Sequence, residues 1–258
     1  MKNSRAVIEV RQNDLVKLLQ QNGRMSVEEI AERLNVTMAT VRRDLAALEP
    51  TGVLRRGFGT AEYVHRDNMR DIEPTNVEDE KALVRRKLAR QAASMIDDGD
   101  VVFVNSSGTA SLVLEYLEDK RVTILTNNAR IINRSYPSSV HLLLVGGEVY
   151  GRKQSLIGQF ALDTINLVKA NKCILGISGI SGTGGLTSVI LPETQVNMLM
   201  IQQCQGNVIV VADSSKVGIT HNFYSGNLRD VTHLVTDGLA DPRSLADIEQ
   251  HGVQVIKV

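Results

Sequence analysis

Short apolar runs alternate with helical segments from residue 101 to the end of the chain, and this alternation constrains the fold more than any other feature. The runs are rich in β-branched side chains, which is typical of parallel strands buried on both faces. A parallel sheet with crossover helices is therefore predicted, which places this part of the chain in the α/β class. Its strands are expected at Val101–Val104, Val122–Leu125, His141–Val145, Cys173–Ile177, Val208–Ala212, His233–Thr236 and Val253–Ile256.

The segments before and between these runs have the apolar spacing of amphipathic helices. Hydrophobic residues make up 43% of the chain, which is enough for a sizeable core, while aromatic residues make up only 3%. The core is therefore expected to be aliphatic. Helices are expected at Glu78–Ile96, Ala110–Leu117, Phe160–Val168, Glu193–Cys204 and Pro242–Gln250.

The N-terminal region follows another pattern, in which three short helices precede a hairpin. The first helix is expected over Asn13–Gln21. The run Ser26-Val27-Glu28-Glu29 is a capping box that starts a second helix, and Thr37 caps a third. Capped helices joined by a tight turn and followed by a glycine-tipped hairpin are typical of a winged helix-turn-helix. The hairpin strands are expected at Val53–Leu54 and Ala61–Tyr63.

The third helix of such a domain enters the major groove of DNA with its first turn toward the base edges. Arg42 can bond a guanine through two hydrogen bonds, and Met38 and Ala39 can contact thymine methyl groups. Thr40 and Arg43 are placed for phosphates. Double-stranded DNA is therefore the expected partner. The other residues expected to contact DNA are Ser26, Thr37 and, on the wing, Arg55 and Arg56.

A solvated basic face on an ordinary helical domain is the alternative interpretation of this region. Residues 1–66 carry 11 Lys or Arg against 8 Asp or Glu, an excess too mild to establish a nucleic-acid module by itself. The order of helices, turn and hairpin favours DNA binding. We expect a DNA-binding domain over residues 11–64, a polar linker over residues 65–77 and an α/β domain over residues 78–258.

Neither a membrane segment nor a metal site is expected. No apolar run is long enough to span a bilayer, and Met1–Val10 lacks the apolar core of a signal peptide, so a cytoplasmic location is predicted. Cys173 and Cys204 are far apart in sequence and are interpreted as small buried hydrophobes. The histidines do not cluster with either cysteine, and no cofactor is expected.

The stretch GRMSVEEIAERLNVTMATVRRDLAALEPTGVLRR, which begins at Gly23, closely resembles the N-terminal signature of the DeoR family of bacterial transcriptional regulators. Its most specific part is Thr-Val-Arg-Arg-Asp-Leu at Thr40–Leu45. The resemblance extends to the C-terminus, whereas residues 1–10 have no counterpart. In the second domain it is carried by Glu80-Lys81, Thr126–Asn128, Gly146-Gly147, Gly158, Gly176–Gly179, Glu193 and Ala212–Lys216.

This resemblance implies a sensor domain similar to the folds of ribose-5-phosphate isomerase and the CoA-transferases. It also implies a phosphorylated sugar or related metabolite as effector, and usually repression of a carbohydrate operon. No catalytic activity is expected, because Asn105 has replaced the carboxylate that proton transfer would need. One small recognition helix binds DNA weakly, so a homodimer or homotetramer is expected.

Two motifs depart from the family pattern. The wing usually reads Arg-x-His-Gly-Gly-Ala, but Phe58 replaces the His and Thr60 a Gly. The first sensor loop usually reads Asp-x-Gly-Ser/Thr-Thr, but here Asn105 replaces the Asp and Ser107 the first Gly. The contacts of the wing and the chemistry of the sensor loop are therefore expected to differ from the usual pattern.

The sensor loop follows a predicted strand and precedes a predicted helix, which is where open α/β sheets bind ligands. Ser106, Ser107, Gly108 and Thr109 are predicted to cradle a phosphate, since small residues let backbone N–H groups approach an anion. A hydroxyl-capped turn would favour the same residues. Asn105 and Glu193 are predicted to bond the hydroxyls of the sugar. The other effector candidates are Asn127, Gly146, Gly147, Arg152, Gly179 and Lys216.

Several of these residues also have an interpretation that involves no ligand. Glu193 is equally suited as a favourable acid at a helix N-terminus, and Lys216 as a solvated surface lysine. The glycine-rich stretch Gly176–Gly185 does not open a helix, because Leu186–Ser188 looks extended, so a flexible loop is favoured over a dinucleotide site.

Two other functions compete with a regulator. A sugar-phosphate isomerase or transferase would place acid–base groups at the strand ends, but Asn105 cannot act as a base. A protein-interaction adaptor would leave the arginines of the third helix unexplained.

Overall fold

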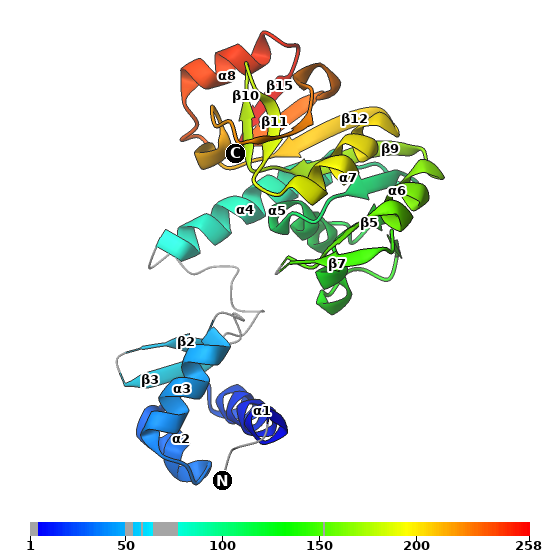
Figure 1. Ribbon diagram of the computed structural model, residues 1–258. Helices are drawn as coiled ribbons and strands as arrows, with labels where there is room; N and C mark the ends of the chain where they lie inside the picture. The colour runs from blue at the N-terminus through cyan, green and yellow to red at the C-terminus, as the bar shows by residue number, and fades with distance from the viewer. Residues whose placement is uncertain (1–4, 50–53, 58, 64–76, 152) are drawn as a thin grey trace. The chain divides into compact units, whose positions relative to one another are not determined.

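The computed structural model describes residues 5–49, 54–57, 59–63, 77–151 and 153–258 (Figure 1). The chain divides into two compact units, Met1–Glu73 and Pro74–Val258. In the part of the chain that the structure describes, no helix has the length and apolarity that crossing a bilayer requires.

The described residues of the N-terminal unit form three helices and a three-stranded antiparallel sheet, as expected for a winged helix-turn-helix. The first helix begins at Arg5, eight residues before the predicted start. A strand at Arg24–Ser26 was not predicted, because three residues are too few to show a period; it pairs with the last strand of the hairpin. The elements are α1 (Arg5–Asn22), β1 (Arg24–Ser26), α2 (Val27–Arg33), α3 (Met38–Leu48), β2 (Leu54–Arg56) and β3 (Thr60–Tyr63).

The capping box predicted at Ser26 is present and starts α2. The Ser26 hydroxyl accepts a hydrogen bond from the Glu29 backbone N–H at 3.1 Å. The Glu29 carboxylate accepts one from the Ser26 backbone N–H at 2.7 Å. These two bonds satisfy backbone donors that the first turn of a helix cannot pair internally.

A buried ion pair joins the first helix of this unit to the third. The Arg11 Nε lies 2.5 Å from the Asp44 carboxylate, and Arg11 Nη2 donates to its other oxygen at 3.1 Å. The Asp44 side chain is only 4% exposed and that of Arg11 14%. The pair lies beside an apolar core that includes Leu15, Ile30 and Leu45, so it aligns α1 and α3 where water is largely excluded.

A seven-stranded parallel sheet forms the centre of the C-terminal unit, in the order β15-β14-β12-β9-β4-β5-β6. All seven predicted strands are in it, with ends shifted by at most a few residues. The strands are β4 (Val101–Val104), β5 (Val122–Thr126), β6 (Val140–Leu144), β9 (Ala170–Gly176), β12 (Cys204–Val211), β14 (His233–Thr236) and β15 (Gln254–Lys257).

Both faces of this sheet are buried under helices, which explains why its strands are apolar at consecutive positions. On β9, Cys173 and Leu175 belong to one hydrophobic cluster, and Ile174, between them, belongs to the other. The first cluster includes apolar side chains of α6, α7 and α8, and the second those of α4 and the α5 region. The helical elements are α4 (Val77–Ser94), α5 (Gly108–Ser111), η3 (Leu112–Tyr116), η4 (Ala129–Asn133), α6 (Gln159–Asn166), α7 (Leu191–Gln202), η5 (Ser214–Lys216), η6 (Leu228–Asp230) and α8 (Pro242–Glu249).

Two small antiparallel sheets accompany the main sheet, and most of their strands were not predicted. One is a hairpin and the other has the strand order β10-β11-β13. Only the extended conformation of Leu186–Ser188 was expected from the sequence, and it lies in β11. The strands are β7 (Glu148–Tyr150), β8 (Ser155–Ile157), β10 (Gly179–Ser181), β11 (Gly185–Ser188) and β13 (Phe223–Gly226).

Both cysteines lie in central strands of the main sheet, and neither forms a disulfide. Cys173 is buried within β9, and Cys204 is half-buried at the start of β12. Burial raises the pKa of the Cys173 thiol well above its ordinary value, and burial also raises the pKa of the Cys204 thiol. Both therefore remain thiols at neutral pH.

We expect Asp44→Ala to destabilise the N-terminal unit by about 3 kcal/mol, because it leaves the Arg11 guanidinium without its partner in a site shielded from water. Amide hydrogen exchange of α1 and α3 in the full-length chain measures this loss. Asp14→Ala is the matched control, since Asp14 and Lys17 form an exposed pair at 3.9 Å. The control should change stability by less than about 0.5 kcal/mol. Equal losses in the two variants would contradict the prediction.

Candidate functional site

The first two turns of α3 present the side chains that were predicted to read DNA. Thr37 caps the helix: its hydroxyl accepts a hydrogen bond from the Thr40 backbone N–H at 3.3 Å. Met38 is 45% exposed, and Ala39, Arg42 and Arg43 are exposed as well. Within the described part of the chain, neither arginine forms a hydrogen bond or salt bridge. Both guanidinium groups are therefore available to a partner.

The wing is present as the hairpin of β2 and β3. Arg55 lies opposite Glu62 and Arg56 opposite Ala61 in its register. The side chains of both arginines lie outside what the structure describes, as does Phe58. Ser26 is half-buried, and its hydroxyl is engaged in capping α2.

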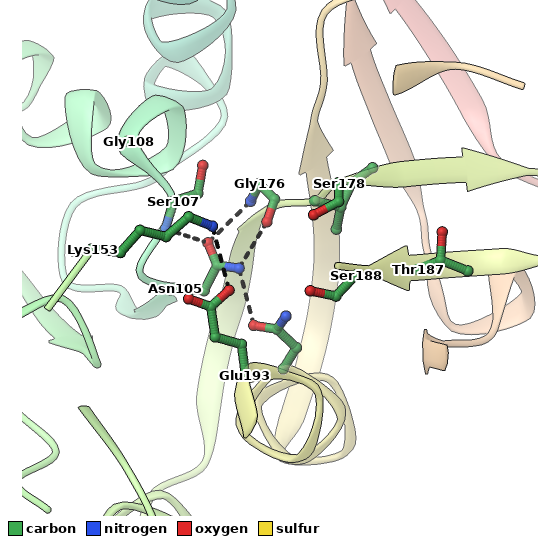
Figure 2. A pocket seen from close by; sticks show the side chains of 11 residues that line it. Asn105, Ser107, Gly108, Lys153, Gly176, Ser178, Thr187, Ser188 and Glu193 are labelled. Carbon is green, nitrogen blue, oxygen red and sulfur yellow. Dashed lines mark hydrogen bonds and ion pairs between the residues drawn. The ribbon is translucent and has the colours of Figure 1, made fainter. Parts of the chain in front are cut away.

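A polar cavity lies at the carboxyl ends of β4 and β9, the two central neighbours of the main sheet (Figure 2). Of the predicted effector residues, it brings together Asn105, Ser107, Gly108 and Glu193. Seven further residues line it that were not among the sequence candidates: Lys153, Gly176, Ile177, Ser178, Thr187, Ser188 and Asn197.

The loop after β4 and the end of β9 approach each other closely. A Cβ atom at Gly176 would lie 1.9 Å from the Ser107 hydroxyl oxygen, so only glycine fits there. That hydroxyl caps the short helix α5 by accepting from the backbone N–H groups of Thr109 and Ala110. The hydroxyl-capped turn described above as an alternative is therefore present, at the same place as the cavity.

The Asn105 side chain makes four hydrogen bonds within the protein. Its carbonyl oxygen accepts from the backbone N–H groups of Ser107 at 3.2 Å and Gly176 at 3.0 Å. Its amide nitrogen donates to the Gly176 carbonyl at 2.9 Å and to the Asn197 side-chain oxygen at 3.0 Å. Asn105 is only 3% exposed. It therefore joins β4, β9 and α7 at the base of the cavity.

Glu193 and Lys153 are the charged groups among the described residues of the lining. Glu193 is 6% exposed in the first turn of α7, and its carboxylate accepts from the Ser155 hydroxyl at 2.6 Å. Lys153, in the turn between β7 and β8, reaches the same carboxylate at 3.4 Å, and its side chain is 50% exposed. Figure 2 shows the two side chains pointing toward each other. The Ser106 hydroxyl donates a 3.5 Å hydrogen bond to the same carboxylate.

The other candidates from the sequence that the structure describes lie outside the lining of this cavity. Asn127 is fully buried, where its amide donates to the Leu156 carbonyl. A Cβ atom at Gly147 or Gly179 would come within 2.4 Å of a backbone oxygen, so close packing accounts for both glycines. Lys216 lies in η5, half-buried. Thr109, Gly146 and Lys216 do not line the cavity, and Arg152 lies outside the described residues.

Lys153 and the β11 residues were missed for a common reason. Both come from short antiparallel strands or their turns, which carry no apolar period. The sequence features closest to the missed residues were Arg152, which is next to Lys153, and the glycine-rich stretch that contains Gly176. Among the described residues, no group of three or more His, Cys, Asp or Glu could hold a metal ion.

Family models match both units of the chain. The DeoR-like helix-turn-helix domain matches residues 11–67, and the DeoR C-terminal sensor domain matches residues 80–238. The second match alone covers more than half of the 258 residues.

Whole-length relatives carry similar descriptions. The glycerol-3-phosphate regulon repressor of Escherichia coli is 28% identical over 250 residues, 95% of this chain and 97% of that protein. The transcriptional repressor GlcR of Bacillus subtilis is 29% identical over 246 residues, 94% and 93% of the two chains. The lactose phosphotransferase system repressor of Streptococcus mutans is 27% identical over 234 residues, 89% and 92% of the two chains.

Solved structures give weaker likenesses. The sorbitol operon regulator SorC of Klebsiella pneumoniae has a TM-score of 0.43 at 12% identity, covering 93% of this chain and 98% of that one. Ribose 5-phosphate isomerase A of Methanocaldococcus jannaschii has a TM-score of 0.38 at 14% identity, covering 53% and 54%. Values this low support no conclusion about function. The matches of the family models to both units show instead that this chain belongs to the DeoR family of transcriptional regulators.

Proposed function

We propose that this protein is a repressor of a carbohydrate operon and that a phosphorylated sugar, bound in the cavity at the ends of β4 and β9, modulates its binding to DNA. The proposal that the protein binds an effector rests on the polar lining of the cavity, in which Lys153 and Glu193 face each other. The relatives described above are named as repressors, two of them of glycerol-3-phosphate and lactose systems.

DNA reading is assigned to the first two turns of α3. Arg42 bonds a guanine, and Met38 and Ala39 pack against thymine methyl groups, because these side chains are exposed at the helix end that enters the groove. Thr37, Thr40 and Arg43 contact phosphates. The wing arginines Arg55 and Arg56 add contacts to the backbone or minor groove, and Ser26 supports this surface by capping α2.

The effector's two chemical parts are assigned to different sides of the cavity. A phosphate takes the Lys153 ammonium and the Gly108 backbone N–H, because an anion gains most from a cation and an N–H donor, whereas the Ser107 N–H already donates to Asn105. The sugar hydroxyls donate to the Glu193 carboxylate and exchange hydrogen bonds with Ser188 and other hydroxyls of the lining. Binding then separates Lys153 from Glu193, which changes the contacts of the hairpin that carries Lys153.

The role is regulatory, and the ligand leaves unchanged. The Glu193 carboxylate is engaged by Ser155, Ser106 and Lys153. Asn105 stands where related loops have an Asp, and an amide does not transfer protons at neutral pH. An isomerase would need a carboxylate free to take a proton from the sugar.

For DNA reading, we expect Arg42→Ala to weaken binding to the specific site by ~1–3 kcal/mol, since it removes contacts to a base edge. Arg43→Ala should weaken binding to all sequences and lower the salt slope by about one, since it removes a phosphate contact. Fluorescence anisotropy with a duplex from upstream of the protein's own gene and a scrambled duplex, each over a salt series, measures both. An Arg42→Ala variant with unchanged preference between the duplexes would refute the assignment.

For the effector, we expect Lys153→Ala to lower the affinity for phosphorylated sugars by roughly tenfold or more, because it removes a charged hydrogen-bond donor. Lys216→Ala is the matched control, since Lys216 was also a candidate but lies outside the cavity. Calorimetric titration with glucose 6-phosphate and glycerol 3-phosphate compares the two variants with the parent chain. If Lys216→Ala loses affinity and Lys153→Ala does not, the phosphate does not bind at Lys153.

For assembly, we propose a homodimer or homotetramer, because one recognition helix per chain gives too little contact for specific binding. Light scattering on the chain at micromolar concentration should give at least twice the mass of one protomer. Footprinting should show half-sites on one DNA face, ~34 Å or a multiple apart. A monomer both free and on DNA would exclude this proposal.

A further inference from the structure

The strand β7 has a free edge at the surface of the C-terminal unit. Its one neighbour among the described strands is β8, so the opposite side of β7 pairs with no described strand. Figure 1 shows this hairpin at the margin of the unit. Val149 is 62% exposed and Tyr150 is 43% exposed, although both are large hydrophobic side chains. An exposed edge that carries such side chains is a template for pairing with another strand.

The backbone groups that face this edge belong to Val149. In β8, the Leu156 N–H donates to the Asn127 carbonyl at 2.7 Å, and the Leu156 carbonyl accepts from the Asn127 side chain at 3.2 Å. Leu156 therefore turns its backbone groups away from β7. Hydrogen-bonded and non-hydrogen-bonded residue pairs alternate along an antiparallel pair of strands. Val149, which lies opposite Leu156, therefore turns its own N–H and C=O away from β8 and toward the free edge.

Only one register lets this edge pair with a copy of itself. The outward groups of one strand must meet those of the other, so Val149 must lie opposite Val149, Gly147 or Gly151 of the second copy. Gly147 has a φ of 100° and Gly151 a φ of 61°, so neither is in the extended conformation that a strand requires. In the remaining register Val149 lies opposite Val149 about a two-fold axis, and each N–H donates to the C=O of the other.

The side chains that this register brings together are complementary. Glu148 lies opposite Tyr150 of the second copy, so the two glutamates are not directly opposite each other and each carboxylate can accept from a tyrosine hydroxyl. The antiparallel arrangement also directs the turn of each hairpin, which carries the half-exposed Lys153, toward Glu148 of the other copy. The Glu148 side chain is exposed and forms no ion pair with a described residue.

The length of β7 favours a second copy over a strand of another protein. The strand is extended over Glu148–Tyr150 and is bounded on both sides by glycines at positive φ. A longer strand would run past these glycines and leave its own backbone groups unpaired, whereas a second β7 ends where the first one does. A pairing of identical strands also closes after two copies, which prevents the open-ended association that exposed edges otherwise promote.

We propose that two copies of this chain associate through β7: the two hairpins pair edge to edge at Val149 and form one four-stranded antiparallel sheet about a two-fold axis. This inference rests on the homo-oligomer of the proposed function and names the surface that forms it. Lys153 lies in the turn of the same hairpin and also lines the cavity. The effector cavity and the subunit contact therefore share one structural element.

The first test is disulfide cross-linking of Val149→Cys in the full-length chain. The Cα atoms of a hydrogen-bonded antiparallel pair lie ~5.5 Å apart, which a disulfide can span. Leu239→Cys is the matched control, because Leu239 is 85% exposed and follows β14, toward the other end of the main sheet. With copper phenanthroline as oxidant, Val149→Cys should form a linked dimer at least roughly tenfold faster than the control, since paired thiols have a high effective concentration.

The second test is analytical ultracentrifugation of Val149→Pro. Proline is tolerated on an edge strand where its missing N–H would face solvent, so the hairpin keeps its bonds to β8. The variant should dissociate at an at least roughly tenfold higher concentration than the parent chain, because two intersubunit hydrogen bonds are lost. Val149→Thr is the matched control, since it keeps the N–H and a β-branched side chain, and it should associate like the parent. Circular dichroism shows whether each variant is folded.

Each outcome supports or overturns the proposal. Fast cross-linking of Val149→Cys and weak association of a folded Val149→Pro support it. If the parent chain is an oligomer but Val149→Cys links no faster than Leu239→Cys, or a folded Val149→Pro associates like the parent, the subunits associate through another surface. If Val149→Pro does not fold, the cross-linking rate decides. A parent chain that is monomeric both free and on DNA would contradict the proposed assembly itself and leave the β7 edge to a strand of another protein.

Discussion

Burial of both faces of the parallel sheet is the constraint from which the sensor unit follows. Helices cover each face, so polar chemistry is confined to the ends of the strands. In a parallel sheet the carboxyl ends share one edge, and β4 and β9 are neighbours there although about 70 residues separate them in sequence. Asn105 meets Gly176 for this reason. The cavity exists because two strands end side by side and the loops beyond them are small.

At the amino-terminal edge of the same sheet, charged side chains pair with one another. Lys172 is buried within β9 and contacts Asp97 at 2.6 Å and Asp100 at 2.5 Å, both in the turn before β4. Burial lowers the pKa of Lys172, but its hydrogen bonds to the two carboxylates outweigh this effect and hold the pKa above its ordinary value. Salt bridges occupy this edge of the sheet, whereas a cavity lined in part by the uncharged amides of Asn105 and Asn197 lies at the carboxyl edge.

The local sequence pattern predicted the helices and the strands of the main sheet. It missed residues whose position depends on contacts between distant parts of the chain. Helix caps and apolar periods are short-range signals, so Ser26, Thr37 and the strands of the main sheet were placed from the sequence. Lys153 was missed because its hairpin has three-residue strands and no period. Gly147 and Gly179 resembled ligand-binding glycines because packing and ligand approach demand the same residue, and only coordinates separate the two causes.

The most specific motif of the N-terminal unit serves two purposes on one helix. Within Thr40–Leu45, Val41, Asp44 and Leu45 are buried, at the spacing of one helix face, while Arg42 and Arg43 are exposed. In the sequence, Asp44 therefore resembles part of a charged surface. In the structure, it anchors α1 through its ion pair with Arg11. No sequence rule could pair these two residues, which are 33 positions apart.

The full burial of the Cys173 thiol and the partial burial of the Cys204 thiol make this chain a convenient subject for site-directed spectroscopy. Alkylating reagents attack the thiolate, and burial disfavours that form at Cys173 and Cys204. A cysteine introduced at an exposed position, such as Ala39 on α3 or Val149 on the β7 hairpin, would therefore react far faster than either native thiol. Spin labels or fluorophores could be attached without first removing Cys173 from the core, so the response of each unit to a ligand can be followed in the unaltered fold.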